Sequence, residues 1–271
     1  IKECDWSSDV CSSDLAALDA AVGVLVDELK KAGEWERTVM MISGDHGPPG
    51  FPHGKCNLYD FGTRVPLIIA GPGIHGGRVV DDFVSLPDLA PTILETAGVK
   101  VPQTMTGRSL RAQLEAPRGG QIDPQRTWVV TGRERHVAMA REGGLPYPQR
   151  AIRTPDFLFV VNFHPERWPL GDPRRLDRSN TNKDAELTEE KLCNETFVTL
   201  SDEDAGPTKA WLVLNRDDSA VRPYFDRAYG RRPREELYDL RRDPDQMKNV
   251  SDEVAYASVR DDLREIGRSH V

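Results

Sequence analysis

A carboxylate and an imidazole stand together at the end of an apolar run. Residues 38–43 are β-branched or apolar except for the last, and Gly44 separates them from Asp45 and His46. We expect residues 38–43 to form a strand buried on both faces, because short apolar runs bounded by glycine are typical of such strands. Side chains at the carboxyl end of a strand can converge on one ligand, and this pair suits a divalent metal. An ordinary turn with a loop histidine is the alternative interpretation.

More polar residues follow in a fixed order. Lys55 lies in a loop stiffened by prolines, and an Asn-Leu-Tyr segment (57–59) and a Gly-x-Arg-x-Pro segment (62–66) come next. Together with Ser-x-Asp-His-Gly at residues 43–47, this order resembles the sulfatase family of the alkaline-phosphatase-like superfamily. The resemblance implies hydrolysis of a sulfate ester or sulfamate. It also implies that Asp45 and His46 bind a divalent metal, most simply Ca²⁺, and that Lys55 is a catalytic residue that contacts the sulfate.

The second half of the chain carries arginines and a histidine suited to an anionic sugar. The segments 132–136 and 147–153 resemble the N-sulfoglucosamine sulfohydrolase (heparan N-sulfatase) branch of the family. Fixed cations bind sulfate or carboxylate well, so we expect Arg133, His136 and Arg64 to be substrate-binding residues. A surface ion pair is the alternative role for Arg133. The arginine-rich run 222–234 is interpreted as a solvated face instead of a polyanion site.

The family nucleophile is absent from the sequence. In sulfatases it is a formylglycine made from the cysteine of a C-x-[PA]-x-R motif, and none of the cysteines at positions 4, 11, 56 and 193 begins such a motif. We expect the formylglycine and the remaining metal ligands in a missing N-terminal half of the same domain. The resemblance therefore predicts a sulfatase fragment that is inactive alone. Cys56 is expected to have a small apolar role.

Two other functions stay open. A phosphodiesterase or phosphonate monoester hydrolase of the same superfamily shares the Asp-His pair, so the nucleophile segment would have to distinguish it. A non-catalytic glycan-binding protein on a sulfatase scaffold belongs to a different class, and an intact upstream motif would exclude it.

The helices and strands that are expected to position these residues indicate an α/β fold. An amphipathic helix is expected from Ala16, with Gly33 after its end, and it feeds the strand at 38–43. We expect residues 16–116 to form part of an alkaline-phosphatase-like sandwich. Residues 117–271 are expected to form a C-terminal subdomain, a small antiparallel sheet with a closing helix. Residues 1–15 contain a near-duplicate, WSSDV and CSSDL, and are predicted to be a foreign or disordered segment.

Composition excludes some partners. Asp and Glu exceed Lys and Arg by 44 to 36, which gives a formal charge of −8. Nucleic-acid binders usually carry a basic excess, so we expect no nucleic acid as partner. No apolar run is long enough to span a bilayer. The expected partner is a sulfated sugar or another sulfate ester, and family resemblance alone favours a periplasmic or secreted location.

Overall fold

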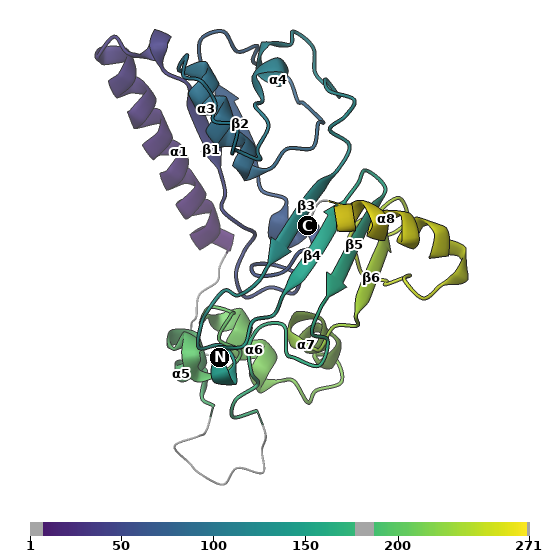
Figure 1. Cartoon of the computed structure of the whole chain (residues 1–271). Helices are drawn as coiled ribbons and strands as arrows, with labels where there is room; N and C mark the ends of the chain where they lie inside the picture. Colours follow the sequence, from purple (N-terminus) through teal and green to yellow (C-terminus); the bar gives the residue numbers. More distant parts are fainter. Residues whose placement is uncertain (1–7, 177–186, 270–271) are drawn as a thin grey trace. The chain divides into compact units, whose positions relative to one another are not determined.

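The computed structural model describes residues 8–176 and 187–269 of the chain (Figure 1). It divides into two compact units: residues 1–43 with 66–125, and residues 44–65 with 126–271. The segment that holds Asp45, His46 and Lys55 belongs to the second unit. The predicted domain boundary after residue 116 stays a prediction.

The first unit begins with helix α1, Ser8–Lys31. Gly33 ends it with φ +71, and the amide of Glu34 donates to the carbonyl of Leu29, which is the hydrogen bond of a Schellman motif. The helix was predicted from Ala16 but starts at Ser8, so residues 8–15 are helical. That residues 1–15 are a foreign segment stays a prediction. Residues 1–7 lie outside the described residues.

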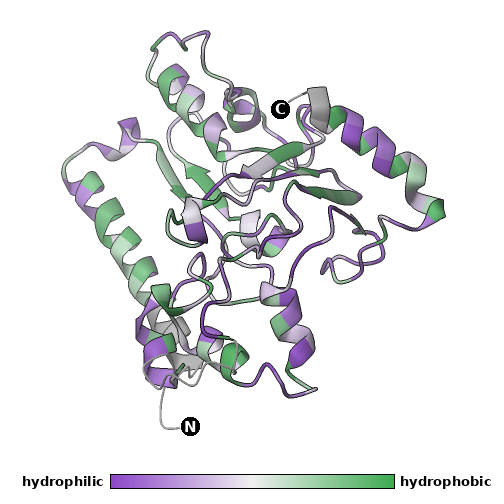
Figure 2. Cartoon of the chain, turned by 60° about the horizontal axis from the view of Figure 1, so that its bottom comes forward, coloured by the Kyte–Doolittle hydropathy of each residue, from purple (hydrophilic) through white to green (hydrophobic). Residues whose placement is uncertain are grey.

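Strand β1, Met40–Ser43, pairs antiparallel with β2, Leu67–Ala70. The strand predicted at 38–43 is therefore confirmed. The prediction that this strand is buried on both faces is wrong, because Met40, Met41 and Ile42 are only partly buried and Ser43 is exposed. Apolar residues along α1 are exposed as well (Figure 2), among them Leu25 at 61%.

In the rest of the first unit, a capping box marks the start of a helix. Ser85 and Asp88 exchange side-chain and backbone hydrogen bonds at the start of a 3-10 turn that leads into α3, Leu89–Thr96. The sequence carries the signature of this helix start, Ser-x-x-Asp at residues 85–88. Helix α4, Arg111–Glu115, completes the helices of this unit in the described residues.

The second unit is built on a four-stranded antiparallel sheet. Its strands follow chain order, β3-β4-β5-β6, as Figure 1 shows. The strands are β3 (Val129–Arg133), β4 (Gln149–Arg153), β5 (Phe157–Asn162) and β6 (Glu235–Asp239). The small antiparallel sheet expected in the second half of the chain is thus present.

The two faces of this sheet are buried by different segments. Along β5, Phe159 packs with Leu263 of helix α8, Ala257–Ser269, while Leu158 and Val160 pack on the opposite face. This alternation follows from the two-residue period of a strand. On that opposite face lies Tyr59, just before the short helix α2, Asp60–Thr63. The sheet therefore anchors the segment that follows Lys55.

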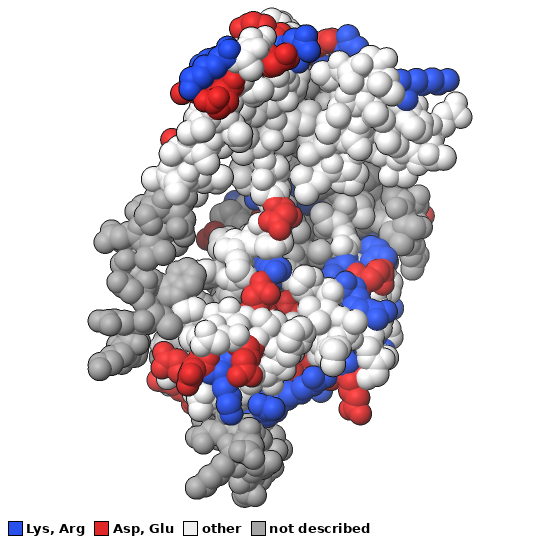
Figure 3. All heavy atoms as spheres, turned by 90° about the vertical axis from the view of Figure 1, so that its left-hand side faces the viewer, with Lys and Arg blue, Asp and Glu red and all other residues white. Residues whose placement is uncertain are grey.

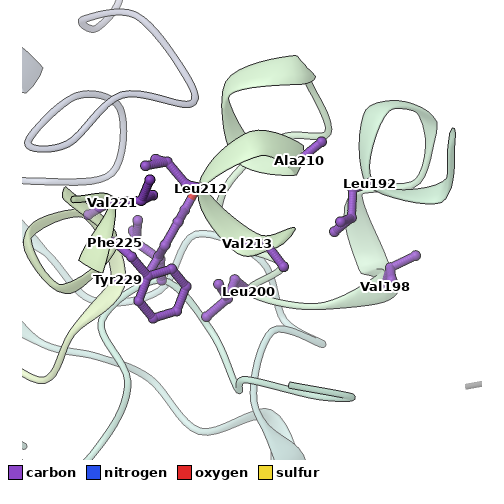
Figure 4. Packing of buried hydrophobic residues seen from close by; sticks show 11 residues of the cluster. Leu192, Val198, Leu200, Ala210, Leu212, Val213, Val221, Phe225 and Tyr229 are labelled. Carbon is purple, nitrogen blue, oxygen red and sulfur yellow. The ribbon is translucent and has the colours of Figure 1, made fainter. Parts of the chain in front are cut away.

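A helical cluster in the second half was not predicted from the sequence. Helices α5, Glu189–Asn194, α6, Pro207–Leu214, and α7, Arg222–Tyr229, enclose a buried hydrophobic cluster (Figure 4). Phe225 and Tyr229 of α7 pack there at 5.3 Å between ring centroids. The C-terminal subdomain is accordingly more than a small sheet and one helix.

Surface charge and helix hydropathy agree with the composition. On the face shown in Figure 3, basic and acidic side chains of the described residues are interspersed instead of forming a continuous basic track. Among the helices of the described residues, none combines the length and apolarity needed to cross a membrane.

Replacing Leu237 with alanine should destabilise the second unit by roughly 2–5 kcal/mol, because the side chain is fully buried on β6 and its loss leaves a cavity. Val254 is 91% exposed, so Val254→Ala serves as the matched control and should change the free energy of unfolding by less than about 0.5 kcal/mol. Urea denaturation followed by circular dichroism measures both. Equal effects would show that the sheet face is not a packed core.

Candidate functional site

Asp45 and His46 follow β1 after a single glycine, as the sequence predicted. The Nε2 atom of His46 lies 3.1 Å from Oδ2 of Asp45, and its Nδ1 lies 2.7 Å from the carbonyl oxygen of Gly47. The Asp45 side chain is 85% exposed, so its oxygens are available to a ligand. The two side chains converge on each other, and their atoms can approach one cation.

As a metal site this pair is incomplete. The described residues contain no cluster of three or more His, Cys, Asp or Glu side chains that could hold a metal. One carboxylate and one imidazole fit a divalent ion as two of its ligands, but calcium usually takes about six to eight oxygens. Among the described residues, Asp45 and His46 are thus two candidate ligands, and no complete shell is present.

The loop after His46 is folded tightly against α2. The amide of Gly47 donates to the carbonyl of Gly62 at 2.9 Å. A Cβ atom at Gly47 would overlap the carbonyl oxygen of Phe61, so this position requires glycine. Arg153 of β4 holds the start of α2 through a two-pronged ion pair with Asp60, with Nε and Nη2 each 2.9 Å from a carboxylate oxygen. These contacts fix both ends of the segment that carries Lys55.

Lys55 is paired with an acidic residue from a distant segment. Its ammonium donates to Oδ2 of Asp204 at 2.6 Å, and its side chain is 15% exposed. Burial lowers the pKa of Lys55, but the hydrogen bond and charge of Asp204 outweigh it and leave the pKa above its ordinary value. Lys55 is therefore a positioned, charged group. Among the described residues, Lys55 forms no hydrogen bond or ion pair with Asp45 or His46.

Asp204 belongs to residues 201–205, which we call the acidic loop. Glu203 of this loop accepts a hydrogen bond from the amide of Gly50 and is almost fully buried. Lys209 of α6 donates to the carbonyl oxygens of Thr196, Leu200 and Glu203 at 3.2, 3.2 and 2.8 Å. Burial raises the pKa of the Glu203 carboxyl to about 7 and lowers that of Lys209 to about 8.

The acidic loop also holds Cys56. The thiol donates to the carbonyl of Asp202 at 3.3 Å, and burial raises its pKa to about 12. A thiol held in its protonated form is a poor nucleophile. The geometry supports the expectation that Cys56 has a packing role.

The three predicted substrate-binding residues differ in their surroundings. The Arg133 guanidinium donates to the carbonyl oxygens of Cys56 and Pro169 and lies over the ring of Tyr147. Burial lowers its pKa. Arg133 thus ties chain segments together, whereas His136 and Arg64 are exposed. The role of all three residues in substrate binding stays a prediction.

Sequence reasoning missed the acidic loop. Asp202 forms a buried ion pair with Arg141 at 2.8 Å and also accepts from the amide of Val137. The signal was the run Ser-Asp-Glu-Asp-Ala at 201–205, three consecutive acids ahead of a helix. Such a run usually lies in solvent, so its burial could not be anticipated from composition alone.

The proton on Glu203 should make stability depend on pH. Its pKa is about 7 in the folded protein against an ordinary 4.5, so the folded state holds the proton more tightly between these values. As pH rises from 4.5 to 7, the wild type should lose on the order of 1–3 kcal/mol relative to Glu203→Gln, whose amide keeps an acceptor for Gly50. Urea titrations at several pH values measure the difference. The exposed Glu142→Gln is the control, and a parallel pH profile for Glu203→Gln and wild type would contradict this assignment.

Comparison with known proteins adds to this geometry. Residues 11–99, which include Asp45, His46 and Lys55, match the family model described as Sulfatase. Human N-sulphoglucosamine sulphohydrolase is 30% identical over 272 residues, covering 93% of this chain and 46% of that protein. The chain therefore spans less than half the length of this relative.

Solved structures share the fold. The phosphonate monoester hydrolase of Agrobacterium radiobacter superposes with a TM-score of 0.57 at 21% identity, covering 94% of this chain and 39% of that one. A protein solved in complex with its substrate D-glucosamine-2-N,6-O-disulfate gives 0.56 at 21% identity, covering 94% and 38%. The fold is thus the α/β fold of alkaline-phosphatase-like proteins, and residues 11–99, which hold the ordered motif from Asp45 to Pro66, match the sulfatase family.

Proposed function

We propose that this chain carries part of the active site of a hydrolase that cleaves a sulfate ester or sulfamate of a sugar. The observation that carries the proposal is one loop, residues 45–55, with an oxygen–nitrogen pair at its start and a half-buried, charged lysine at its end. Sulfate transfer needs such groups beside the sulfur atom and its oxygens. The match of residues 11–99 to the Sulfatase model supports the assignment.

The chemistry asks for positive charge around the sulfate oxygens. Charge develops on these oxygens and on the leaving group as the bond to sulfur breaks, and fixed cations stabilise it. In our proposal Asp45 and His46 bind a divalent cation, most simply Ca²⁺, which acts as a Lewis acid toward the sulfate when bound. The Lys55 ammonium holds a sulfate oxygen and exchanges its partner Asp204, whose side chain is 43% exposed, for the substrate.

The proposed substrate is an N-sulfated or O-sulfated glucosamine unit. Support comes from the human N-sulphoglucosamine sulphohydrolase, which aligns along 93% of the chain, and from the structural neighbour solved with D-glucosamine-2-N,6-O-disulfate. As part of the same proposal, we place this protein outside the cytoplasm, in the periplasm or secreted, by extension from the family. The exposed His136 and Arg64 remain candidates for sugar contacts.

A phosphonate monoester hydrolase is the second candidate. The superposition on the Agrobacterium radiobacter enzyme, with a TM-score of 0.57, favours keeping it. Both activities need the Asp-His pair as metal ligands and a fixed cation. The test is therefore to compare the rates of hydrolysis of sulfate and phosphonate substrates side by side.

We expect residues 1–271 to show no turnover by themselves. A C-x-[PA]-x-R motif is absent from the sequence, and loss of a nucleophile typically lowers the rate by orders of magnitude. Purified protein should be assayed with an aryl sulfate, an N-sulfated glucosamine and an aryl phosphonate in the presence of calcium. Metal-dependent turnover that Asp45→Ala abolishes would mean that the nucleophile lies among the residues present.

Calcium should still bind, weakly, at Asp45 and His46. With two protein ligands the ion stays mostly hydrated, so we expect a Kd on the order of millimolar. Calorimetric titration should lose this binding in Asp45→Asn and keep it in Asp81→Asn, an exposed aspartate of the first unit. Equal binding by both variants would remove the metal role of Asp45.

A further inference from the structure

Two phenylalanine side chains are exposed in the segment 44–65 of the second unit, which also carries the candidate site. Phe51 is 38% exposed, and Phe61 of α2 is 52% exposed. Their ring centroids lie 6.2 Å apart, and the ring planes stand nearly perpendicular, at 84°. We call Phe51 and Phe61 the exposed pair. A single exposed apolar residue is ordinary, but two aromatic rings in contact form one continuous apolar surface.

The backbone on either side of Phe51 is held in place. The amide of Gly54 donates to the carbonyl oxygen of Phe51 at 3.0 Å. Pro52 and His53, the latter at φ +63, occupy the two central positions, which is the pattern of a type II turn. The amide of Gly50 donates to the acidic loop. The Phe51 ring is therefore carried by a backbone that does not have to be ordered when a ligand binds.

A second aromatic pair from the same two stretches is buried. His53 and Tyr59, at 7% and 1% exposure, are stacked with their ring centroids 3.7 Å apart. The Tyr59 hydroxyl donates to Glu236 of β6 at 2.7 Å. The guanidinium of Arg232 lies 5.6 Å from the centre of the Tyr59 ring. Arg232 is 8% exposed, so the prediction that the run 222–234 is a solvated face is wrong at this residue. The buried pair thus fixes both stretches to the sheet.

The chain contributes to the two pairs in alternation. Phe51 and His53 are two residues apart, and so are Tyr59 and Phe61, so each stretch supplies one ring to the buried pair and one to the exposed pair. The buried pair already joins the two stretches. The exposed pair therefore leaves apolar surface in water at a free-energy cost that packing does not require, which points to a role in binding.

The exposed pair adjoins the groups that are assigned to the sulfate. The carbonyl oxygen of Phe61 lies against Gly47, where a Cβ atom would overlap it, and Gly47 directly follows His46. Phe51 lies in the turn that ends directly before Lys55. Each phenylalanine is thus attached beside one end of the loop 45–55.

We propose that Phe51 and Phe61 form an aromatic platform that binds the apolar face of the substrate's pyranose ring. The C–H groups of a pyranose ring form an apolar face, and they pack well against the negative face of an aromatic ring. Lys55 holds the sulfate oxygens, and the platform selects a ring-shaped carrier. The sulfated sugar as ligand rests on the proposed function, whereas the preference of the platform for a pyranose ring is separate from it.

The test is a ligand-observed NMR titration, by saturation transfer, of residues 1–271 with three probes. N-sulfated glucosamine offers the ring and the sulfate, methyl β-glucopyranoside offers the ring alone, and sorbitol offers hydroxyl groups without a ring. We expect N-sulfated glucosamine to bind with a Kd on the order of millimolar. Methyl β-glucopyranoside should bind more weakly, and sorbitol should not bind.

Phe61→Leu is the decisive variant, because it keeps an apolar side chain and removes the aromatic face. It should weaken the binding of both sugars about three- to tenfold, the usual effect of one aromatic contact, and Phe51→Leu should act in the same direction. Phe61→Tyr keeps the ring and should retain wild-type binding. The matched control is Phe197→Leu, which should change neither affinity, because Phe197 is 58% exposed elsewhere in the second unit.

The platform and the proposed function fail in different ways. Equal binding by Phe61→Leu and wild type, equal losses in Phe61→Leu and Phe197→Leu, or no binding of methyl β-glucopyranoside would each overturn the platform. Sorbitol that binds as tightly as methyl β-glucopyranoside would do the same. Lys55→Met reports on the sulfate contact. If it binds N-sulfated glucosamine as wild type does while Phe61→Leu weakens methyl β-glucopyranoside, the platform stands and the proposed function loses its sulfate contact.

Discussion

The ion pair between Lys55 and Asp204 joins two segments separated by 149 positions in the chain. Around it, the acidic loop accepts hydrogen bonds from the amide of Gly50 and the thiol of Cys56, and Lys209 donates to the carbonyl oxygen of Glu203 in the loop. Charged groups are costly to bury singly, so each of these contacts depends on the others. The position of the candidate sulfate-binding lysine thus depends on a polar network contributed by the second half of the chain.

This arrangement has a consequence for substrate binding. Lys55 already has a carboxylate partner, so under the proposed function a sulfate would compete with Asp204 for it. A carboxylate that occupies an ammonium holds it charged and oriented before substrate arrives. Under the same proposal this contact would lower the affinity for simple anions and favour ligands that make additional contacts.

Short sequence patterns were enough to predict several helices and strands and the positions of the motifs. The Asp45–His46 pair after a strand and the antiparallel sheet of the second half were both predicted from the sequence. Burial of β1 was not predicted correctly, since it depends on which elements cover a strand and not on its residues. The acidic loop and the buried Arg232 were missed for a related reason, because charged runs are exposed by default and only long-range contacts bury them.

The two units differ in how they are held together. The buried hydrophobic clusters of the described residues all lie in the second unit. Among the described residues of the first unit, Leu110 is the one large apolar side chain that is buried, and residues of α1 and β2 remain accessible. Local opening free energies follow buried contacts. Backbone amides of β1 and β2 should accordingly exchange with deuterium well before those of β5 and β6, so the strand that presents Asp45 and His46 is attached to the less protected part of the molecule.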